Sequence, residues 1–256
     1  MIIKKFIFVL VLAATAGLAK AQTTQVIAHR GFWKTEGSAQ NSLTALHKAD
    51  SIGCYGSEFD VWITKDNQLV VNHDPNFQSK SMEKSNASTL TALQLANGEN
   101  LPTLKEYLKA GKKLKTKLIL ELKAHSKPER ETKAIEEIVA MVKKMKMESR
   151  MEYITFSLHA LKEFIRLAPK GTPVFYLEGK LSPKELKALG SAGPDYHLGV
   201  FQKNPEWIKE CHELGLKVNV WTINKEEEMK WLIDKKVDFI TTNEPVLLKE
   251  LLGTKE

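Results

Sequence analysis

Short runs of β-branched and aromatic residues alternate with segments of helical periodicity from residue 26 almost to the C-terminus. Such alternation is typical of βαβ units, which build a parallel sheet covered by helices. Eight strands are predicted, at residues 26–30, 58–64, 118–122, 153–157, 174–178, 196–200, 217–222 and 238–242. Helical periodicity is clearest at 43–52, 129–147, 158–167 and 226–233. Eight strands in a chain of this length fit a closed (β/α)8 TIM barrel better than an open doubly wound sheet.

The interval between the second and third predicted strands departs from this alternation. Asp66-Asn67 indicates a turn, so residues 69–73 are predicted to return as the second arm of a hairpin. A polar stretch, 74–100, and a short helix near 104–108 follow. We expect the polar stretch to form a small insertion over one end of the barrel. No G-x-G-x-x-G motif follows the first strand, which argues against a dinucleotide site of the common kind.

The first 21 residues have the pattern of a secretory signal peptide. Lys4 and Lys5 precede an almost wholly apolar stretch, 6–18, and residues 19–21 read Ala-Lys-Ala, an A-x-A cleavage site. The apolar stretch is shorter than the roughly 20 residues that span a bilayer, which favours cleavage over a retained anchor. We therefore expect an exported, periplasmic or secreted protein with one domain, residues 22–256, and no stable membrane insertion after cleavage.

The charge pattern argues against a nucleic-acid partner. The formal net charge is +7 for the whole chain, and it becomes +4 once the three lysines of the signal peptide are removed. Lysines alternate with glutamates along the helical segments, and no basic run contains interleaved aromatic residues. The two cysteines, Cys54 and Cys211, lack the spacing of a zinc site. Export would allow them to pair, but we expect free buried thiols.

Polar residues gather where the predicted strands end, which is where barrel enzymes build their sites. They are His29 and Arg30 at the end of the first strand, Glu58 and Asp60 at the start of the second, His73 at the end of the hairpin arm, and Glu121 and Lys123 at the end of the third. Residues two apart in a strand point to one side, so the two carboxylates of the second strand face the same way. Taken singly, each residue has an ordinary structural explanation. Their shared position at one end of adjacent strands favours a site.

Three carboxylates that converge on one point repel each other unless a cation holds them together. Oxygen ligands favour a hard divalent ion, Ca²⁺ or Mg²⁺, over Zn²⁺. Arg30 and Lys123 beside that ion would bind an anionic oxygen pair such as a phosphate. His29 and His73 would supply a base and an acid near neutral pH. The set therefore predicts metal-assisted phosphoryl transfer.

Several blocks of the sequence resemble the motifs of the glycerophosphodiester phosphodiesterase family, and they occur in the family's order. These blocks are His29-Arg30-Gly31, Glu58-Phe59-Asp60-Val61, Thr64-Lys65-Asp66, Val71-Asn72-His73-Asp74, Glu121-Leu122-Lys123, Val220-Trp221-Thr222 and Ile240-Thr241-Thr242-Asn243. The resemblance covers nearly the whole chain after the signal peptide. It implies a (β/α)8 barrel with a small insertion. It also implies a phosphoric diester hydrolase that converts a small-molecule glycerophosphodiester to glycerol 3-phosphate and an alcohol.

The resemblance further implies a role for each site residue. Metal ligation falls to Glu58, Asp60 and Glu121, acid–base catalysis to His29 and His73, and phosphate binding to Arg30 and Lys123. Either histidine could be the base. Trp221 would flank the glycerol or would be an ordinary core tryptophan. Glu178, at the end of the fifth predicted strand, would bind glycerol hydroxyls or would be a surface carboxylate beside Lys180.

One position departs from the family pattern. The family usually carries Pro-Glu-Asn-Thr shortly after the first strand, where this chain has Ala39-Gln40-Asn41-Ser42. Gln40 keeps a hydrogen-bond acceptor but loses a charge, which bears on metal affinity and substrate preference. We expect Gln40 to lie close to His29 and Arg30 without being a metal ligand, and Ser42 to cap the following helix.

Two other functions remain open at this point. The barrel could bind a phosphodiester or a metal without turnover, which the loss of charge at Gln40 favours and the two histidines disfavour. It could also be a glycosidase that uses Glu121 and Glu178 across a sugar. A glycosidase, however, would leave the two cations and both histidines without a function.

Overall fold

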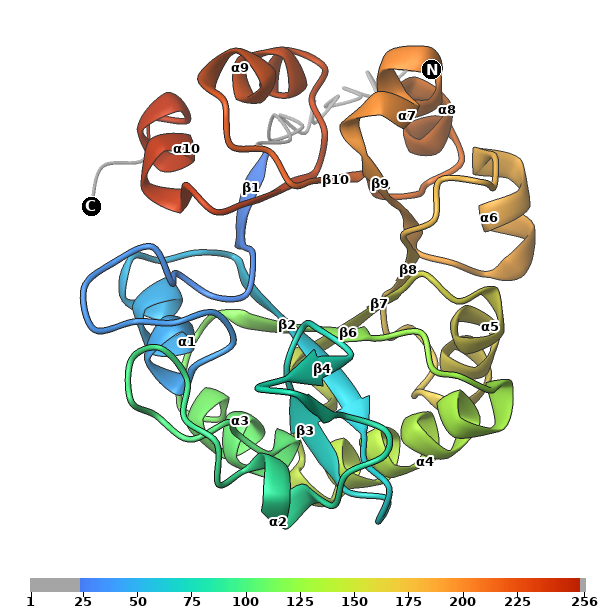
Figure 1. Cartoon of the computed structure of the whole chain (residues 1–256). Coiled ribbons are helices and arrows are strands. Elements are labelled where there is room, and N and C mark those ends of the chain that lie inside the picture. Colours follow the sequence, from blue (N-terminus) through green and yellow to red (C-terminus); the bar gives the residue numbers. More distant parts are fainter. Residues whose placement is uncertain (1–23, 254–256) are drawn as a thin grey trace, which may run out of the picture.

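Eight parallel strands form a closed ring with helices around its outside in the computed structural model, which describes residues 24–253 (Figure 1). Around the ring the strands are β1 (Gln25–Ala28), β11 (Phe239–Thr242), β10 (Asn219–Trp221), β9 (Gly193–His197), β8 (Val174–Tyr176), β7 (Met151–Thr155), β6 (Lys117–Leu122) and β2 (Gly56–Ile63). Strand β2 also pairs with β1, which closes the ring. The predicted (β/α)8 TIM barrel is confirmed.

Seven of the eight strands agree with the prediction to within two residues at each end. The sixth was wrong: it was predicted at 196–200, whereas β9 is Gly193–His197 and helix α7 (Leu198–Lys203) begins at the next residue. The His197 side chain caps that helix by accepting a hydrogen bond from the Gly199 N–H at 3.1 Å. Gly193 and Pro194 look like turn residues in the sequence and obscured the start of the strand.

The helices pack their apolar faces against the outside of the barrel. They are α1 (Leu43–Ser51), α3 (Leu104–Gly111), α4 (Pro128–Met145), α5 (Leu158–Leu167), α6 (Pro183–Leu189), α7, α8 (Trp207–Glu213), α9 (Glu226–Asp234) and α10 (Pro245–Leu251), with a 3-10 turn at Glu148–Arg150. Ser42 caps α1 as predicted, by accepting from the Ala45 N–H at 3.0 Å. Between helices and strands lies the main core, in which Phe59 stacks on Tyr107 with ring centroids 4.2 Å apart.

A second apolar cluster fills the inside of the barrel. Ile27, Ile119, Ile154, Phe175 and Phe239 point inward from five different strands and are buried. These side chains close the barrel below its carboxyl-terminal end, so the interior is a packed core with space left at one mouth.

The insertion after β2 has a small core of its own. Strand β3 (Leu69–Val71) runs antiparallel to β2, which confirms the predicted hairpin. The short hairpin β4 (Asn76–Phe77) and β5 (Lys80–Ser81) and the helix α2 (Ala87–Leu90) follow before α3. Trp62 packs with buried apolar residues of this segment. The insertion therefore extends the β2 side of the barrel mouth as a folded unit (Figure 1).

The predicted signal peptide, residues 1–21, lies outside the described residues. Within residues 24–253, no helix combines the length and the apolar character needed to cross a bilayer. Cys54 and Cys211 are free and buried, as expected, and burial raises the pKa of both thiols to about 12.

Candidate active site

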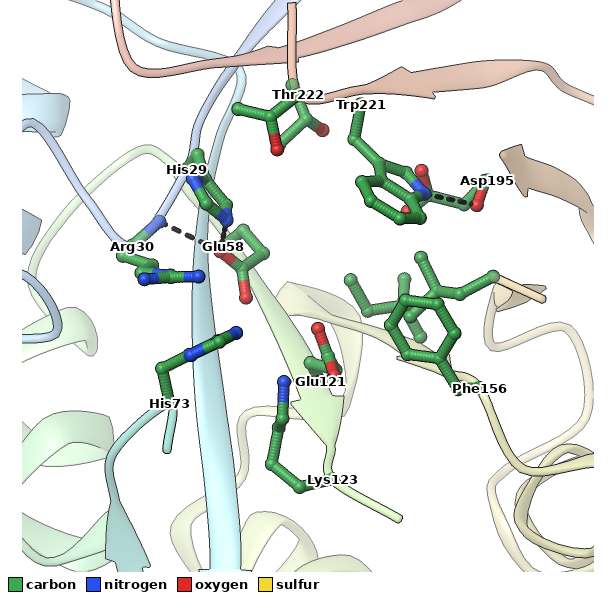
Figure 2. A pocket seen from close by; sticks show the side chains of 13 residues that line it. His29, Arg30, Glu58, His73, Glu121, Lys123, Phe156, Asp195, Trp221 and Thr222 are labelled. Carbon is green, nitrogen blue, oxygen red and sulfur yellow. Dashed lines mark hydrogen bonds and ion pairs between the residues drawn. The ribbon is translucent and has the colours of Figure 1, made fainter. Parts of the chain in front are cut away.

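A cavity of about 110 Å³ lies at the carboxyl-terminal mouth of the barrel (Figure 2). Every barrel strand, or the residue that follows it, contributes a side chain. The lining residues are His29, Arg30, Glu58, His73, Glu121, Lys123, Ile154, Phe156, Leu177, Asp195, Trp221, Thr222 and Thr241. The structure thus brings together both histidines, both cations and Trp221, all of which were predicted from sequence.

Three buried carboxylates converge beside this cavity. Glu58, Asp60 and Glu121 each offer an oxygen atom, and these atoms lie within 4.8 Å of one another. One oxygen of Glu58 accepts from the Arg30 backbone N–H at 2.8 Å, while its Oε1 is buried without a hydrogen-bond partner. Because a buried carboxylate oxygen is rarely left without a partner, this atom is a candidate ligand for a cation.

Two cations stand next to the carboxylates. Lys123 Nζ lies 3.1 Å from Asp60 Oδ1 and 2.7 Å from Glu121 Oε1, and Arg30 Nε lies 3.7 Å from Asp60 Oδ2. Burial would raise the pKa of Asp60, but Lys123, His73 and Arg30 together hold it below its usual value. Burial would likewise lower the pKa of Lys123, yet Asp60 and Glu121 raise it. Both partners of this pair therefore stay charged.

The other two carboxylates have pKa values above their usual range. Burial raises the pKa of Glu58 well above its ordinary value, and the charges of Asp60 and Glu121 add to the rise. Burial and then Asp60 raise the pKa of Glu121 to about 7. This is the expected response of crowded carboxylates without a divalent ion, and the all-oxygen set with its unpaired Glu58 atom fits a hard metal ion.

Asn243 holds the imidazole of His29. Asn243 Oδ1 lies 2.8 Å from His29 Nδ1, and the indole Nε1 of Trp33 donates to the same oxygen at 3.0 Å. An indole N–H can only donate, so the atom that it meets is the amide oxygen and not the amide nitrogen. His29 Nδ1 therefore carries the proton, and Nε2 presents its lone pair 3.9 Å from Glu58 Oε2. Burial and then Arg30 lower the pKa of His29 to about 4, which keeps the ring neutral.

His73 has a different partner. Its Nδ1 lies 2.7 Å from Asp74 Oδ1, and the side chain is 37% exposed. Burial, together with the charges of Lys123 and Arg30, lowers the pKa of His73 below its usual value, and the carboxylates of Asp60 and Asp74 counter only part of this effect. The two histidines thus differ in their hydrogen-bond partner, which is a neutral amide oxygen for His29 and a carboxylate for His73.

Aromatic side chains form the opposite side of the cavity, away from Arg30 and His73 (Figure 2). Trp221 packs edge-on against Phe156 with ring centroids 5.5 Å apart, and its Nε1 donates to the Asp195 backbone carbonyl at 2.7 Å. Asp195 Oδ1 is buried without a hydrogen-bond partner, and burial raises the pKa of this carboxyl to about 8. Trp221 therefore lines the cavity while it packs against the core inside the barrel.

Two further predictions concern Gln40 and Glu178. Gln40 lies beside the site, where its Oε1 accepts from Arg30 Nη1 at 2.5 Å, as expected. Glu178 is not among the described residues that line the cavity, and its Oε1 pairs with Lys180 Nζ at 2.6 Å.

Several site residues received no role from the sequence. Asn41 donates to Asp60 Oδ2 at 2.9 Å and accepts from the Asp60 N–H at 3.2 Å. Asn41 and Asn243 both stand in blocks that resemble family motifs, and their membership in these blocks was the sequence signal that could have assigned them to the site. Phe156 and Asp195 lie in no such block. The place of Phe156 near the end of a predicted strand pointed to it, whereas Asp195 stood just before the predicted start of its strand, so no sequence signal pointed to it.

The whole of this site lies in a segment that matches a known family. Residues 29–247 match the sequence profile of the glycerophosphoryl diester phosphodiesterase family. The chain belongs to this family. Membership confirms the expected enzyme class, a phosphoric diester hydrolase.

Relatives of this phosphodiesterase agree in length and fold. A glycerophosphodiester phosphodiesterase from Caldanaerobacter subterraneus subsp. tengcongensis is 28% identical over 244 residues, covering 90% of this chain and 98% of that protein. The crystal structure of one from Parabacteroides distasonis is 52% identical with a TM-score of 0.90, covering 92% and 99% of the two chains. The structure of an Oleispira antarctica phosphodiesterase was solved in complex with the product sn-glycerol-3-phosphate. That protein is 25% identical with a TM-score of 0.75, and the match covers 90% of this chain and 97% of that one.

Proposed function

We propose that this protein hydrolyses glycerophosphodiesters to glycerol 3-phosphate and an alcohol, with the help of one divalent metal ion. The observation that carries the proposal is the convergence of three buried carboxylates within 4.8 Å beside Arg30, Lys123 and two histidines. The product that the Oleispira antarctica relative binds supports the same substrate class.

Glu58, Asp60 and Glu121 are the residues that would hold the metal. Their oxygens suit Ca²⁺ or Mg²⁺ better than Zn²⁺, because hard divalent cations prefer carboxylate ligands. Bound there, the ion would neutralise charge on a phosphoryl oxygen and lower the pKa of a hydroxyl group. Asn41 would keep Asp60 in place, since it contacts both the side chain and the backbone of that residue.

The two cations would bind the phosphate, and the aromatic side of the cavity would bind the glycerol. Arg30 Nε is buried without a hydrogen-bond partner, so it can donate to a phosphate oxygen. Trp221 and Phe156 offer flat apolar surfaces to the glycerol carbons. Glu178 pairs with Lys180 and is not among the described residues that line the cavity, which favours a surface carboxylate over a glycerol ligand.

The histidines would be the acid–base pair. We assign His29 as the base, because Asn243 holds it neutral with the Nε2 lone pair free. Nε2 would take the proton of the attacking hydroxyl, which is either water or the glycerol hydroxyl next to the phosphoester. His73 would be the acid, because the Asp74 carboxylate favours its protonated form. For displacement in line, the two rings must act on opposite sides of the phosphorus.

A reconstituted assay tests the function. The protein is stripped with a chelator, then supplied with Ca²⁺, Mg²⁺ or Zn²⁺, and glycerol 3-phosphate release is followed across a panel of glycerophosphodiesters. We expect no turnover in chelator and better recovery with Ca²⁺ or Mg²⁺ than with Zn²⁺. Full activity in chelator would refute the metal requirement. Binding of the diesters without turnover under every condition would make the protein a binding protein instead.

We also propose that the protein is exported from the cytoplasm and acts in the periplasm or outside the cell. The basic and apolar N-terminus with its Ala-Lys-Ala site supports export and removal of residues 1–21. Mass spectrometry of the mature N-terminus tests this point, with Gln22 expected as the first residue.

A further inference from the structure

A second cavity adjoins the catalytic one. It has a volume of about 430 Å³ and lies between the loop 30–41 and the insertion that follows β3. Arg30 and His73 line both cavities. These two side chains lie on the side of the catalytic cavity opposite Trp221 and Phe156 (Figure 2). The two cavities therefore meet at the phosphate-binding arginine and at the histidine assigned as the acid.

The volumes suit two different parts of one substrate. Pockets that bury a drug-sized ligand have about 300–1,000 Å³, and the catalytic cavity, at about 110 Å³, is well below that range. A phosphodiester carries an alcohol on each side of the phosphorus. With the glycerol on the aromatic side, the other alcohol must extend past Arg30 and His73.

We propose that this second cavity receives the departing alcohol of the diester and selects head groups that carry no negative charge. The inference rests on the proposed function. As the bond from phosphorus to the attacking oxygen forms, the bond to the head-group oxygen breaks. The proton of the nucleophile passes to His29, and the departing oxygen takes one from His73. The alcohol then lies in the second cavity. Attack by water leaves glycerol 3-phosphate in the first cavity, whereas attack by the glycerol hydroxyl leaves a cyclic glycerol phosphate, which a water molecule must then open to give glycerol 3-phosphate.

The lining of the second cavity supports this selection. Its walls are Trp33, Ala39 and Gln40 on the loop and Phe77, Leu95 and Ala96 on the insertion. Aromatic faces attract cations and accept apolar groups.

The charges around the cavity also disfavour an anionic head group. The carboxylate of Asp74 is 72% exposed. Among the described lining residues the cations are Arg30 and His73, and Asp74 is the carboxylate. Both cations lie at the junction with the catalytic cavity, where they are assigned to the phosphate and to the departing oxygen. An anionic head group would therefore meet a carboxylate without a free cation.

Hydrogen bonds hold the two walls in a fixed relation. Asn97 of the insertion donates to the Gly37 carbonyl of the loop at 3.2 Å. The Glu99 carboxylate accepts from the Leu43 and Thr44 N–H groups at the start of α1, at 2.9 and 3.2 Å. The cavity is thus preformed, as expected of a small-molecule site.

A cavity-filling variant tests the site by size. Ala96 is exposed and lines the cavity, whereas Ala92 is exposed in the same insertion and does not line it. Ala96→Trp is expected to lower kcat/KM for glycerophosphocholine about tenfold more than for the methyl diester, which has a minimal leaving alcohol. Ala96→Leu should give an intermediate ratio, and Ala92→Trp should leave the ratio unchanged.

The outcomes are distinguishable. If Ala96→Trp affects both diesters equally or neither, the second cavity is not the leaving-alcohol site, although the hydrolysis itself stands. If the wild-type protein releases glycerol 3-phosphate from neither diester, the proposed function fails, and this inference fails with it.

Matched three-carbon diesters test the charge selection on the wild-type protein. We would compare glycerophosphodiesters of 1-propanol, 3-aminopropanol and 3-hydroxypropanoate. The carboxylate ester is expected to show a kcat/KM at least about fivefold below the other two, because it faces Asp74. Equal kcat/KM values for the carboxylate and propyl esters would overturn the charge selection.

Discussion

Asn243 accepts a hydrogen bond from His29 across 214 positions of the chain, with 2.8 Å between Oδ1 and Nδ1. This contact leaves the Nε2 lone pair of His29 free to act as a base. Asn243→Ala should therefore lower kcat about 10- to 100-fold, the range typical of a lost outer-shell partner. Nitrogen NMR of His29 should show a mixture of tautomers. Asn243→Asp keeps an acceptor and should retain a single tautomer. Wild-type kcat in Asn243→Ala would refute the positioning role.

The carboxylate cluster should respond to metal in the thermal stability of the protein. Without metal, crowded charges destabilise the cluster, so Ca²⁺ or Mg²⁺ should raise the melting temperature of the wild-type protein. Asp60→Asn should weaken metal binding more than about 100-fold in calorimetry and abolish the thermal shift. Glu178→Gln is the matched control, because this carboxylate lies outside the cavity lining. An unchanged thermal shift in Asp60→Asn would refute the ligand assignment.

The two histidines should be separable by the leaving group. Each His→Ala variant is expected to lose about 10²–10⁴ in kcat, the usual range for general acid–base catalysis, while metal binding survives. A p-nitrophenyl diester needs little protonation of its leaving oxygen, so it should restore turnover in His73→Ala. The same diester should not restore turnover in His29→Ala, because the attacking hydroxyl still needs a base. Equal rescue of both variants would contradict the assignment of acid and base, and near-normal turnover in the double variant would refute both roles.

Gln40 should tolerate the return of the family's carboxylate. Its Oε1 accepts from Arg30 Nη1 at 2.5 Å, and a carboxylate would keep this contact and add charge. We expect Gln40→Glu to retain kcat within about threefold, since no metal ligand changes, and to bind the metal as tightly or more tightly. Gln40→Ala, which removes the acceptor, is the control and should raise KM for the anionic substrate. Loss of metal binding in Gln40→Glu would contradict this prediction.

Asp195 should make stability depend on pH. Burial raises its pKa from 3.8 to about 8, so between these values the folded protein holds a proton that the unfolded chain releases. Stability should therefore fall as pH rises through this window, by up to about 1.4 kcal/mol per pH unit. Asp195→Asn removes this pH dependence. In urea unfolding, the free energy of unfolding of the variant relative to that of the wild-type protein should therefore rise from pH 5 to 8. Asp234→Asn, at an exposed carboxylate, should show no such trend.

The sequence alone determined the barrel and most of its site. Alternating strand and helix patterns leave few topologies, and parallel strands bring their carboxyl ends to one mouth. His29, Glu58, Glu121 and Trp221 could therefore be placed together before any coordinates. Residues two apart on β2 share a face because the strand repeats every two residues.

Tertiary structure decided what lies beyond the strand ends. There the period of two no longer applies, so the sequence left the direction of Glu178 open and could not foresee that Asn243 reaches His29. The start of β9 was hidden because Gly193 and Pro194 resemble a turn, and burial inside the barrel overrides that preference. Similarly, the raised pKa of Asp195 comes from its surroundings in the folded barrel. Contacts between distant segments set these features, and no local pattern in the chain records them.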